Sequence, residues 1–549
     1  MPPETPARPS VYGRVPDTDE AIGHVPAVPL DGLLRLTAAA VPDRAALITP
    51  EGMLRYAELD ALVDGAARVL AEAAVGPGAV VGVVSALTPA FAVAYYGTVR
   101  ARCVVAIINP FLRGDALAHI LGSASVTVVV APPEHSARVE EVRDRLEGPL
   151  TVLSPEDILG AGYGTPLGGP LPEPGDMACA QFTSGTTGAP KTVRLTHRNL
   201  VANATQIAAV HGLDSTSVTV NHLPLFHPMH LNSAVRAGAT QVLVPDADPA
   251  QAVGAANRHT ASHYYSLPVR LAHLAADPRL PQFRLKSVRA VFSGGSALLP
   301  TPARVLSEHF GIPFVQGYGL AETSPLTHCQ RPADPVPGSV GRAVPGTEHR
   351  IVDIETRSPV PPGSTGEVQV RGPQVMAGYA GDTLPAVDEN GWFSSGDVGR
   401  EDARGNLFLT DRIKDVFKYE NWVVAPTEIE EALVRHPLVD DCAVVDRPDP
   451  AYGAVAHGLL VLSPRAREAE PSEGGPGGAP GSVLERIREQ VNRSLPYYQR
   501  LRYVETADSI PRSPNGKILR RVLREQLARN PGPVSEPAPG PTSPPGGHL

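Results

Sequence analysis

The sequence predicts an α/β protein, and three observations carry that prediction. Apolar runs rich in valine and isoleucine occur at 78–87, 103–109 and 126–131, as in strands of a parallel sheet that is covered on both faces. Amphipathic stretches that end at glycine, such as 198–212, alternate with these runs and indicate helices. The chain of 549 residues is also too long for one hydrophobic core, so we expect more than one domain.

The composition divides the chain into segments. Residues 1–28 are proline-rich and predict a flexible N-terminal segment. Residues 29–412 are expected to form a large N-terminal domain, with two α/β subdomains followed by a small β-barrel-like section of short strands. Residues 413–530 predict a small α+β domain with a flexible insert at 464–481. The composition of 531–549 predicts a disordered tail.

Charge and hydropathy exclude several classes of function. The net charge of -9 argues against a nucleic-acid partner. The sequence contains neither an apolar run long enough to span a membrane nor the apolar core of a signal peptide, so we expect a soluble cytoplasmic protein. The cysteines lie far apart without metal-ligand spacing, which predicts reduced thiols and no zinc site. They are Cys103, Cys179, Cys329 and Cys442.

Lysine is rare in this chain, because arginine supplies nearly all of the 48 basic side chains. A lysine kept in such a background is expected to do what arginine cannot, namely to act as a compact point charge on a flexible stem. The lysines are Lys191, Lys286, Lys414, Lys418 and Lys517.

The stretch "TSGTTGAPK" (183–191) has the chemistry of a polyphosphate cradle. Glycine lets backbone N–H groups approach an anion, and the hydroxyl groups add donors. The stretch follows the expected strand "MACAQF" and precedes an expected helix. It differs from the Walker pattern, because Gly185 and Gly188 are three residues apart and Pro190 precedes the lysine.

The longer string "FTSGTTGAPKTVRLTHRNL" resembles the signature of the adenylate-forming superfamily, which includes acyl-CoA synthetases, luciferases and peptide-synthetase adenylation domains. The overall pattern is most similar to the 4-coumarate-CoA ligase branch. The resemblance continues in order through "LPLFH" (223–227), "SGGSALLP" (293–300), "GYGLAET" (317–323), "GEVQVRGPQVMAGY" (366–379), "GWFSSGDVGRED" (391–402), "DRIKDVFKY" (411–419) and "PNGKILRR" (514–521).

This resemblance implies an ATP-dependent, AMP-forming ligase. An aromatic or other small organic acid would be converted to an acyl-AMP with release of pyrophosphate, and the acyl group would pass to CoA, a carrier-protein thiol or an amine. Residues 29–412 would be the AMP-binding domain and 413–530 a mobile lid. ATP and Mg²⁺ are the implied cofactors.

The resemblance also assigns roles to single residues. The phosphates and the departing pyrophosphate would contact Thr183, Ser184, Gly185, Thr186, Thr187, Gly188 and Lys191. The adenine would lie against Gly295, Ser296, Ala297, Tyr318 and Gly319. The remaining assignments are Glu322 for Mg²⁺, Asp397 and Arg412 for the ribose, Lys414 for the hinge, Lys517 for transition-state charge and His227 for the acid pocket.

Three departures from the family pattern bear on the acceptor and the acid. The usual "YKGF" reads "YENW", so Asn421 and Trp422 stand at the tunnel for the pantetheine arm, and CoA is in doubt as the acceptor. Ala321 lacks a hydroxyl that would contact the α-phosphate, and Thr323 is the expected substitute. The segment after His227 is about one helical turn shorter than in hydroxycinnamate ligases.

Two further readings stay open at this point. Some relatives adenylate nitrite and diazotise an aryl amine, which the altered tunnel and shortened pocket would suit. A catalytically silent nucleotide-binding protein is disfavoured, because the charged residues of the motifs are all present. A pair of metal ligands at His227 and His230 is also disfavoured, since a catalytic site needs about three. No aspartate is found near these histidines, which disfavours α-amino acids.

Overall fold

The computed structural model describes residues 25–74, 76–84, 88–183, 190–223, 228–381, 385–420, 422–468, 482–512 and 518–529. The chain forms two compact units. Unit 1 comprises Met1–Arg350, Gln369–Ser395 and Asp402–Leu407, and unit 2 comprises Ile351–Val368, Gly396–Glu401 and Phe408–Leu549. The α/β class expected from the sequence is confirmed. The domain boundary expected at 412 stays a prediction.

The first sheet of unit 1 has the strand order β18-β8-β7-β4-β3-β5-β6. Strands β3 to β7 pair in parallel, whereas β8 is antiparallel to β7 and to β18. The apolar runs of the sequence form β3, β4 and β5, and nearly all their residues are buried, as expected for a sheet covered on both faces. The bounds are β3 (Val80–Val84), β4 (Val104–Ile108), β5 (Val126–Val130), β6 (Thr151–Leu153), β7 (Met177–Phe182), β8 (Thr192–Thr196) and β18 (Gly378–Tyr379).

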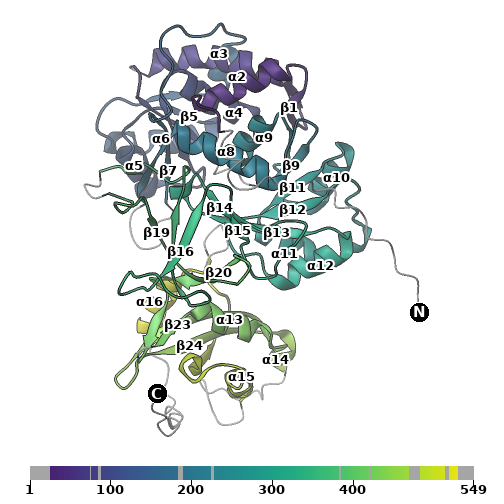
Figure 1. Cartoon of the computed structure of the whole chain (residues 1–549), viewed down its shortest axis with the longest axis vertical. Helices are drawn as coiled ribbons and strands as arrows, with labels where there is room; N and C mark the ends of the chain where they lie inside the picture. The colour runs from purple at the N-terminus through teal and green to yellow at the C-terminus, as the bar shows by residue number, and fades with distance from the viewer. Residues whose placement is uncertain are drawn as a thin grey trace. The chain divides into compact units, whose positions relative to one another are not determined.

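The second sheet of unit 1 has the order β15-β14-β13-β12-β11-β9-β10-β1-β2. Apolar side chains of α10, α11 and α12 pack on one face of β9, β11, β12 and β13, and these elements lie together in Figure 1. The bounds are β1 (Ala45–Thr49), β2 (Gly52–Arg55), β9 (Val218–His222), β10 (Thr240–Leu243), β11 (His263–Ser266), β12 (Ala290–Ser293), β13 (Phe314–Gly319), β14 (Leu326–Cys329) and β15 (Arg342–Ala343).

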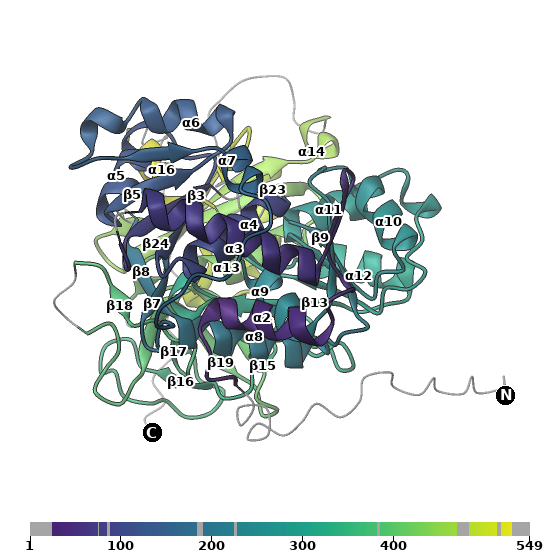
Figure 2. The same cartoon turned by 90° about the horizontal axis from the view of Figure 1, so that it is seen from above.

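The helices of unit 1 confirm the expectation that the stretch 198–212 is a helix that ends at glycine. Helix α8 begins after Thr196, whose hydroxyl accepts a hydrogen bond from Asn199 N, and it ends at Gly212 with a left-handed φ of 66°. Helices α2, α3 and α4 pack against one another (Figure 2). The bounds are α2 (Leu30–Ala40), α3 (Tyr56–Ala73), α4 (Pro89–Arg100), α5 (Gly114–Ser123), α6 (Pro133–Glu140), α7 (Pro155–Gly160), α8 (His197–His211), α9 (Met229–Ala237), α10 (Pro249–Arg258), α11 (Pro268–Ala276), α12 (Pro300–Phe310), η1 (Arg143–Arg145), η2 (Leu280–Gln282) and η3 (Ala321–Thr323).

The β-rich section expected late in the N-terminal domain is a sheet in the order β16-β17-β19-β20. Its strands are β16 (Glu348–Val352), β17 (Gly366–Arg371), β19 (Phe393–Glu401) and β20 (Leu407–Arg412), and each contributes residues to both units.

The C-terminal part of unit 2 has the strand order β22-β21-β24-β23, with β25 beside β24. The insert expected at 464–481 begins with a helix, α14, and Ala466 of that helix is fully buried in the core of unit 2. The prediction of flexibility is therefore corrected for residues 464–468, because this short helix packs against the core of unit 2 through Ala466. The bounds are β21 (Phe417–Tyr419), β22 (Trp422–Val424), β23 (Val439–Asp449), β24 (Gly453–Leu462), β25 (Leu501–Thr506), α13 (Pro426–Val434), α14 (Pro464–Glu468), α15 (Val483–Asn492), η4 (Tyr497–Gln499) and α16 (Arg520–Arg529).

The structure bears on two predictions from composition, which concern the cysteines and membrane-spanning segments. The cysteines are free thiols, and all of them are buried. Within the described residues, the helices are too short or too polar for any of them to cross a membrane.

Candidate active site

The base of the expected phosphate loop is closed by two hydrogen bonds. Thr183 follows β7 and Lys191 precedes β8, and these two strands are antiparallel neighbours. The backbone N of Thr183 donates to the carbonyl of Lys191 at 3.0 Å. The backbone N of Lys191 in turn donates to Oγ1 of Thr183 at 3.0 Å. The strands therefore fix both ends of the loop. Ser184, Gly185, Thr186, Thr187 and Gly188 lie outside the described residues, so their contacts with phosphate stay a prediction.

One tyrosine joins the lysine of this loop to the expected magnesium ligand. The ammonium of Lys191 lies over the ring of Tyr379, 4.5 Å from its centroid. The hydroxyl of Tyr379 donates to Oε1 of Glu322 at 2.9 Å. Glu322 lies in η3, and its carbonyl accepts a hydrogen bond from Met376 N at 2.8 Å. The structure thus brings together two predicted residues that are far apart in the sequence.

Strand pairing explains how Tyr379 reaches this place. In the β18–β8 pair, Tyr379 lies opposite Val193, two residues after Lys191. The flanking bonds from Ala377 N to Arg194 O and from Ala380 N to Thr192 O fix the same register. No role for Tyr379 was predicted from the sequence, although the residue is the last of the motif at 366–379. Only the pairing of β18 with β8 indicates its position.

The residues expected to frame the adenine follow the ends of neighbouring strands. Gly295, Ser296 and Ala297 come after β12, and Tyr318 and Gly319 end β13. Strands β12 and β13 are parallel, so these residues lie at the same carboxyl edge, where α/β sheets bind ligands. This edge is held in place by Gln316, whose side chain accepts from Leu298 N and donates to Ser339 O, each at 2.8 Å.

The turn after β13 needs glycine at 319. A Cβ at that position would lie 1.9 Å from the carbonyl oxygen of Pro325.

Thr323 was expected to replace the hydroxyl that Ala321 lacks. The structure corrects this hypothesis, because the Thr323 side chain is fully buried and its hydroxyl donates to Pro325 O and to Leu320 O, within the same turn.

The expected acid-pocket histidine, His227, lies outside the described residues, so its role stays a prediction. The nearby His230 is described. Its ring stacks on Tyr265 with centroids 3.9 Å apart, and the Tyr265 hydroxyl is 3.0 Å from Nδ1 of His211. Burial lowers the pKa of His211 well below its ordinary value, which indicates a neutral ring in an apolar environment.

The predicted ribose ligands lie together in unit 2. Nε of Arg412, at the end of β20, is 2.8 Å from Oδ1 of Asp397 in β19. Asp397 is 5 % exposed. Ile413 N donates to Gly396 O at 2.9 Å, which joins the segment after β20 to β19. Burial lowers the pKa of the nearby Lys414, the predicted hinge residue.

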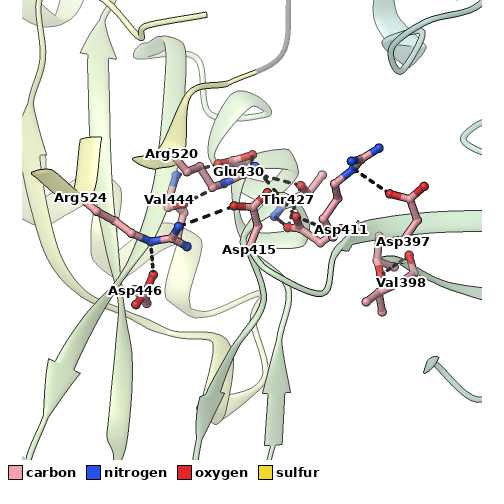
Figure 3. A network of polar contacts seen from close by, with 12 residues as sticks. Asp397, Val398, Asp411, Asp415, Thr427, Glu430, Val444, Asp446, Arg520 and Arg524 are labelled. Carbon is pink, nitrogen blue, oxygen red and sulfur yellow. Dashed lines mark hydrogen bonds and ion pairs between the residues drawn. The ribbon is translucent and has the colours of Figure 1, made fainter. Parts of the chain in front are cut away.

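A second charged group in unit 2 surrounds Arg520 at the start of α16. Its guanidinium donates to both carboxylate oxygens of Glu430, at 2.7 and 2.8 Å, and its Nη1 is 3.9 Å from Asp411 (Figure 3). Asp411 also accepts from the backbone N and the hydroxyl of Thr427, each at 3.0 Å. Burial raises the pKa of Glu430, although Arg520 acts in the opposite sense. This cluster of Arg520, Glu430 and Asp411 was not predicted from the sequence.

Two predicted residues of unit 2, Lys517 and Asn421, lie outside the described residues. Trp422 is described: its side chain is 49 % exposed and its ring stacks on Tyr498, with centroids 4.9 Å apart. Its role at an acceptor tunnel stays a prediction.

The chemistry of Glu322 fits the implied Mg²⁺. This cation prefers carboxylate and phosphate oxygens, and proteins usually hold it through one or two carboxylates plus the phosphates of a substrate. Across the described ranges, no group of three or more His, Cys, Asp or Glu side chains could hold a metal ion alone. A single carboxylate near the lysine of the phosphate loop matches this mode of binding.

An α/β protein in which a lysine before β8 of one sheet and a carboxylate after β13 of another sheet contact the same tyrosine has the features expected of a nucleotide-binding enzyme. Residues 34–380 match the AMP-binding enzyme family, and residues 428–517 match the AMP-binding enzyme C-terminal domain. The chain belongs to the AMP-binding enzyme family, whose members are AMP-forming ligases that activate acids with ATP.

Known relatives agree with this membership. The chain is 32 % identical to 4-coumarate--CoA ligase 2 of Oryza sativa subsp. japonica, over 94 % of each chain. Among solved structures, ATP-bound MatB from Rhodopseudomonas palustris matches with a TM-score of 0.81 and 25 % identity, over 90 % of this chain and 99 % of that one. The amide bond synthetase McbA from Marinactinospora thermotolerans matches with a TM-score of 0.77 and 27 % identity, over 91 % and 100 %.

Proposed function

We propose that this enzyme adenylates an aromatic or other small organic acid and transfers the acyl group to a thiol or an amine. An oxygen of the acid attacks the α-phosphorus of ATP, the bond to the β-phosphate oxygen breaks, and pyrophosphate leaves. The acceptor then displaces AMP from the acyl-AMP. The observation that best supports the first step is the shared contact of Lys191 and Glu322 with Tyr379.

The chain's own residues have separate tasks in this proposal. Lys191 neutralises charge on the departing pyrophosphate, and Glu322 would hold Mg²⁺, which supplies positive charge to the phosphates. Asp397 accepts hydrogen bonds from the ribose hydroxyls, and Arg412 keeps its carboxylate in place. Lys517 would neutralise the charge that develops between the acid and the α-phosphate.

The acceptor is proposed to be an amine or a thiol other than CoA. The replacement of the family's glycine by Asn421 supports this choice, because that glycine would permit close backbone approach and asparagine adds a side chain. The likeness to an amide bond synthetase adds support for an amine. The likeness to 4-coumarate-CoA ligases supports an aromatic acid.

A panel assay tests the proposal. Pyrophosphate release is measured with aryl acids, fatty acids, and nitrite with aryl amines, each with and without CoA or a simple amine. We expect release with aryl acids and an acyl product with amines. Rapid thioester formation with CoA would overturn the choice of acceptor, and activity only with nitrite would favour a diazotase. Formation of ADP, or no reaction with any acid, would overturn adenylation.

Two lysine variants sharpen the assay. Lys517→Ala is expected to lower acid-dependent pyrophosphate release by about a hundredfold or more, because one well-placed cation contributes roughly 3 to 4 kcal/mol to the transition state. Lys286→Ala is the matched control, since Lys286 is exposed and outside the family motifs. Equal activity of the two variants would contradict the role of Lys517.

A further inference from the structure

We propose that Tyr379 is a positioning residue that aims Glu322 at Mg²⁺ and holds Lys191 ready for the phosphates of ATP. This inference rests on the proposed function, because it assigns a task within the same adenylation step. It concerns a residue in unit 1 whose ring and hydroxyl group contact two different charged partners.

Strand pairing fixes the backbone position of Tyr379. Pairing of β18 with β8 sets Tyr379 opposite Val193, and the bonds at Ala377 and Ala380 hold the strand on both sides. Because Lys191 immediately precedes β8, the tyrosine ring and the lysine share one structural frame. A one-residue change in register would move the side chain to the other face of the strand.

The ring acts on Lys191. An ammonium group within about 6 Å of an aromatic centroid is attracted to the ring face, and the distance here is 4.5 Å. The flexible stem of a lysine otherwise samples many rotamers, so this contact lowers the entropy that is lost when phosphate binds.

The hydroxyl acts on Glu322. Its hydrogen bond to Oε1 at 2.9 Å limits rotation of the carboxylate plane. The same segment of chain holds the Glu322 backbone through Met376 N. Lys191 lies over the ring face and Glu322 accepts from the hydroxyl group, so one side chain contacts both charged groups.

Two substitutions separate these tasks. Tyr379→Phe keeps the ring and removes the hydroxyl, whereas Tyr379→Leu removes both. The control is Tyr56→Phe, which deletes a buried hydroxyl that donates to Ala239 O at 2.6 Å, elsewhere in unit 1. The control is expected to lower the melting temperature and to leave the response to Mg²⁺ unchanged.

Calorimetric titration of ATP into each full-length variant, over a series of Mg²⁺ concentrations and without acid, measures binding apart from turnover. For Tyr379→Phe we expect the half-saturating Mg²⁺ concentration to rise about threefold to tenfold, the range for loss of one hydrogen bond, with ATP affinity unchanged at saturating Mg²⁺. Tyr379→Leu should in addition weaken ATP binding about twofold to fivefold at saturating Mg²⁺.

Several results would overturn the inference. They are an unchanged Mg²⁺ response in Tyr379→Phe, changes in both Tyr379 variants no different from those of Tyr56→Phe, or ATP binding by the wild-type protein that does not depend on Mg²⁺. Failure of the proposed function is distinguishable, because the wild-type protein would then bind Mg²⁺-ATP as expected yet release no pyrophosphate with any acid.

Discussion

The two charged groups of this enzyme differ in burial and in the kind of side chain that their charges contact. Around Arg520 in unit 2, guanidinium and carboxylates are buried and bonded directly to one another. In unit 1, Lys191 is exposed and Glu322 is half-buried, and both contact a neutral tyrosine. Removal of one member of a buried pair is strongly destabilising because it leaves the other charge uncompensated, whereas charges that contact an aromatic side chain near the surface can engage a charged ligand. This difference helps to distinguish structural from functional charge.

The largest effect is expected from breaking the buried group. Arg520→Leu leaves Glu430 without its guanidinium partner, so the free energy of unfolding should fall by about 3 to 5 kcal/mol. Urea unfolding followed by the fluorescence of Trp422, in a Trp392→Phe background, reports on unit 2. The double variant Arg520→Leu/Glu430→Leu should recover most of the loss, because Glu430 no longer leaves an unpaired carboxylate and Asp411 keeps its hydrogen bonds from Thr427. Wild-type stability in the single variant would contradict this account.

Removal of the Lys191 charge should lower activity and leave stability nearly unchanged, the opposite of what we expect for Arg520. Lys191→Ala is expected to reduce pyrophosphate release by about a hundredfold, equivalent to roughly 3 kcal/mol of transition-state stabilisation, with little change in melting temperature. Lys286→Ala is again the control. A large fall in melting temperature with normal release would instead make Lys191 a structural residue like Arg520.

Acid is expected to weaken unit 1 through its buried histidines. Burial lowers the pKa values of His222 and His263 to about 4. A group with a lowered folded-state pKa binds fewer protons when folded, so stability is full above the unfolded value of 6.5 and falls as pH decreases towards 4. Between these two pKa values, each histidine lowers the free energy of unfolding by about 1.4 kcal/mol for each unit that the pH falls.

The surroundings of His222 define the control for this pH dependence. Its Nε2 lies 3.0 Å from the carbonyl of Asp246, its Nδ1 lies 3.2 Å from the Tyr264 hydroxyl, and Arg270 adds positive charge that also lowers the pKa. Unfolding in urea between pH 7 and pH 4 should show a shallower slope for His222→Gln than for the wild-type protein. An identical slope would exclude this histidine as a source.

The smallest effect is expected one residue after Arg520. Arg521 forms an exposed pair with Glu525 on the same helix. Arg521→Ala should change the free energy of unfolding by less than about 0.5 kcal/mol, because solvent screens such pairs. The urea assay used for Arg520→Leu measures it. A loss comparable to that of Arg520→Leu would show that burial does not explain the difference between these neighbours.

The sequence allowed prediction of features that depend on local pattern. The runs that became β3 to β5 were visible because both faces of the sheet are covered, and Gly212 marked the end of α8. The contacts of Tyr379 and Arg520 were not visible, because each depends on partners far along the chain. The helix at 464–468 was not predicted, because the surrounding segment is rich in charged residues and glycine. The methyl group of Ala466 is buried there, and composition does not indicate it.

Strand β18 has a practical consequence for anyone who cuts this chain. A fragment ending at Arg350 would keep β8 and the phosphate loop, but it would lose the strand that pairs with the free side of β8. The exposed backbone donors and acceptors would then offer a template for intermolecular pairing. We therefore expect such a fragment to aggregate during purification, and a shortened version of the enzyme should extend beyond Tyr379.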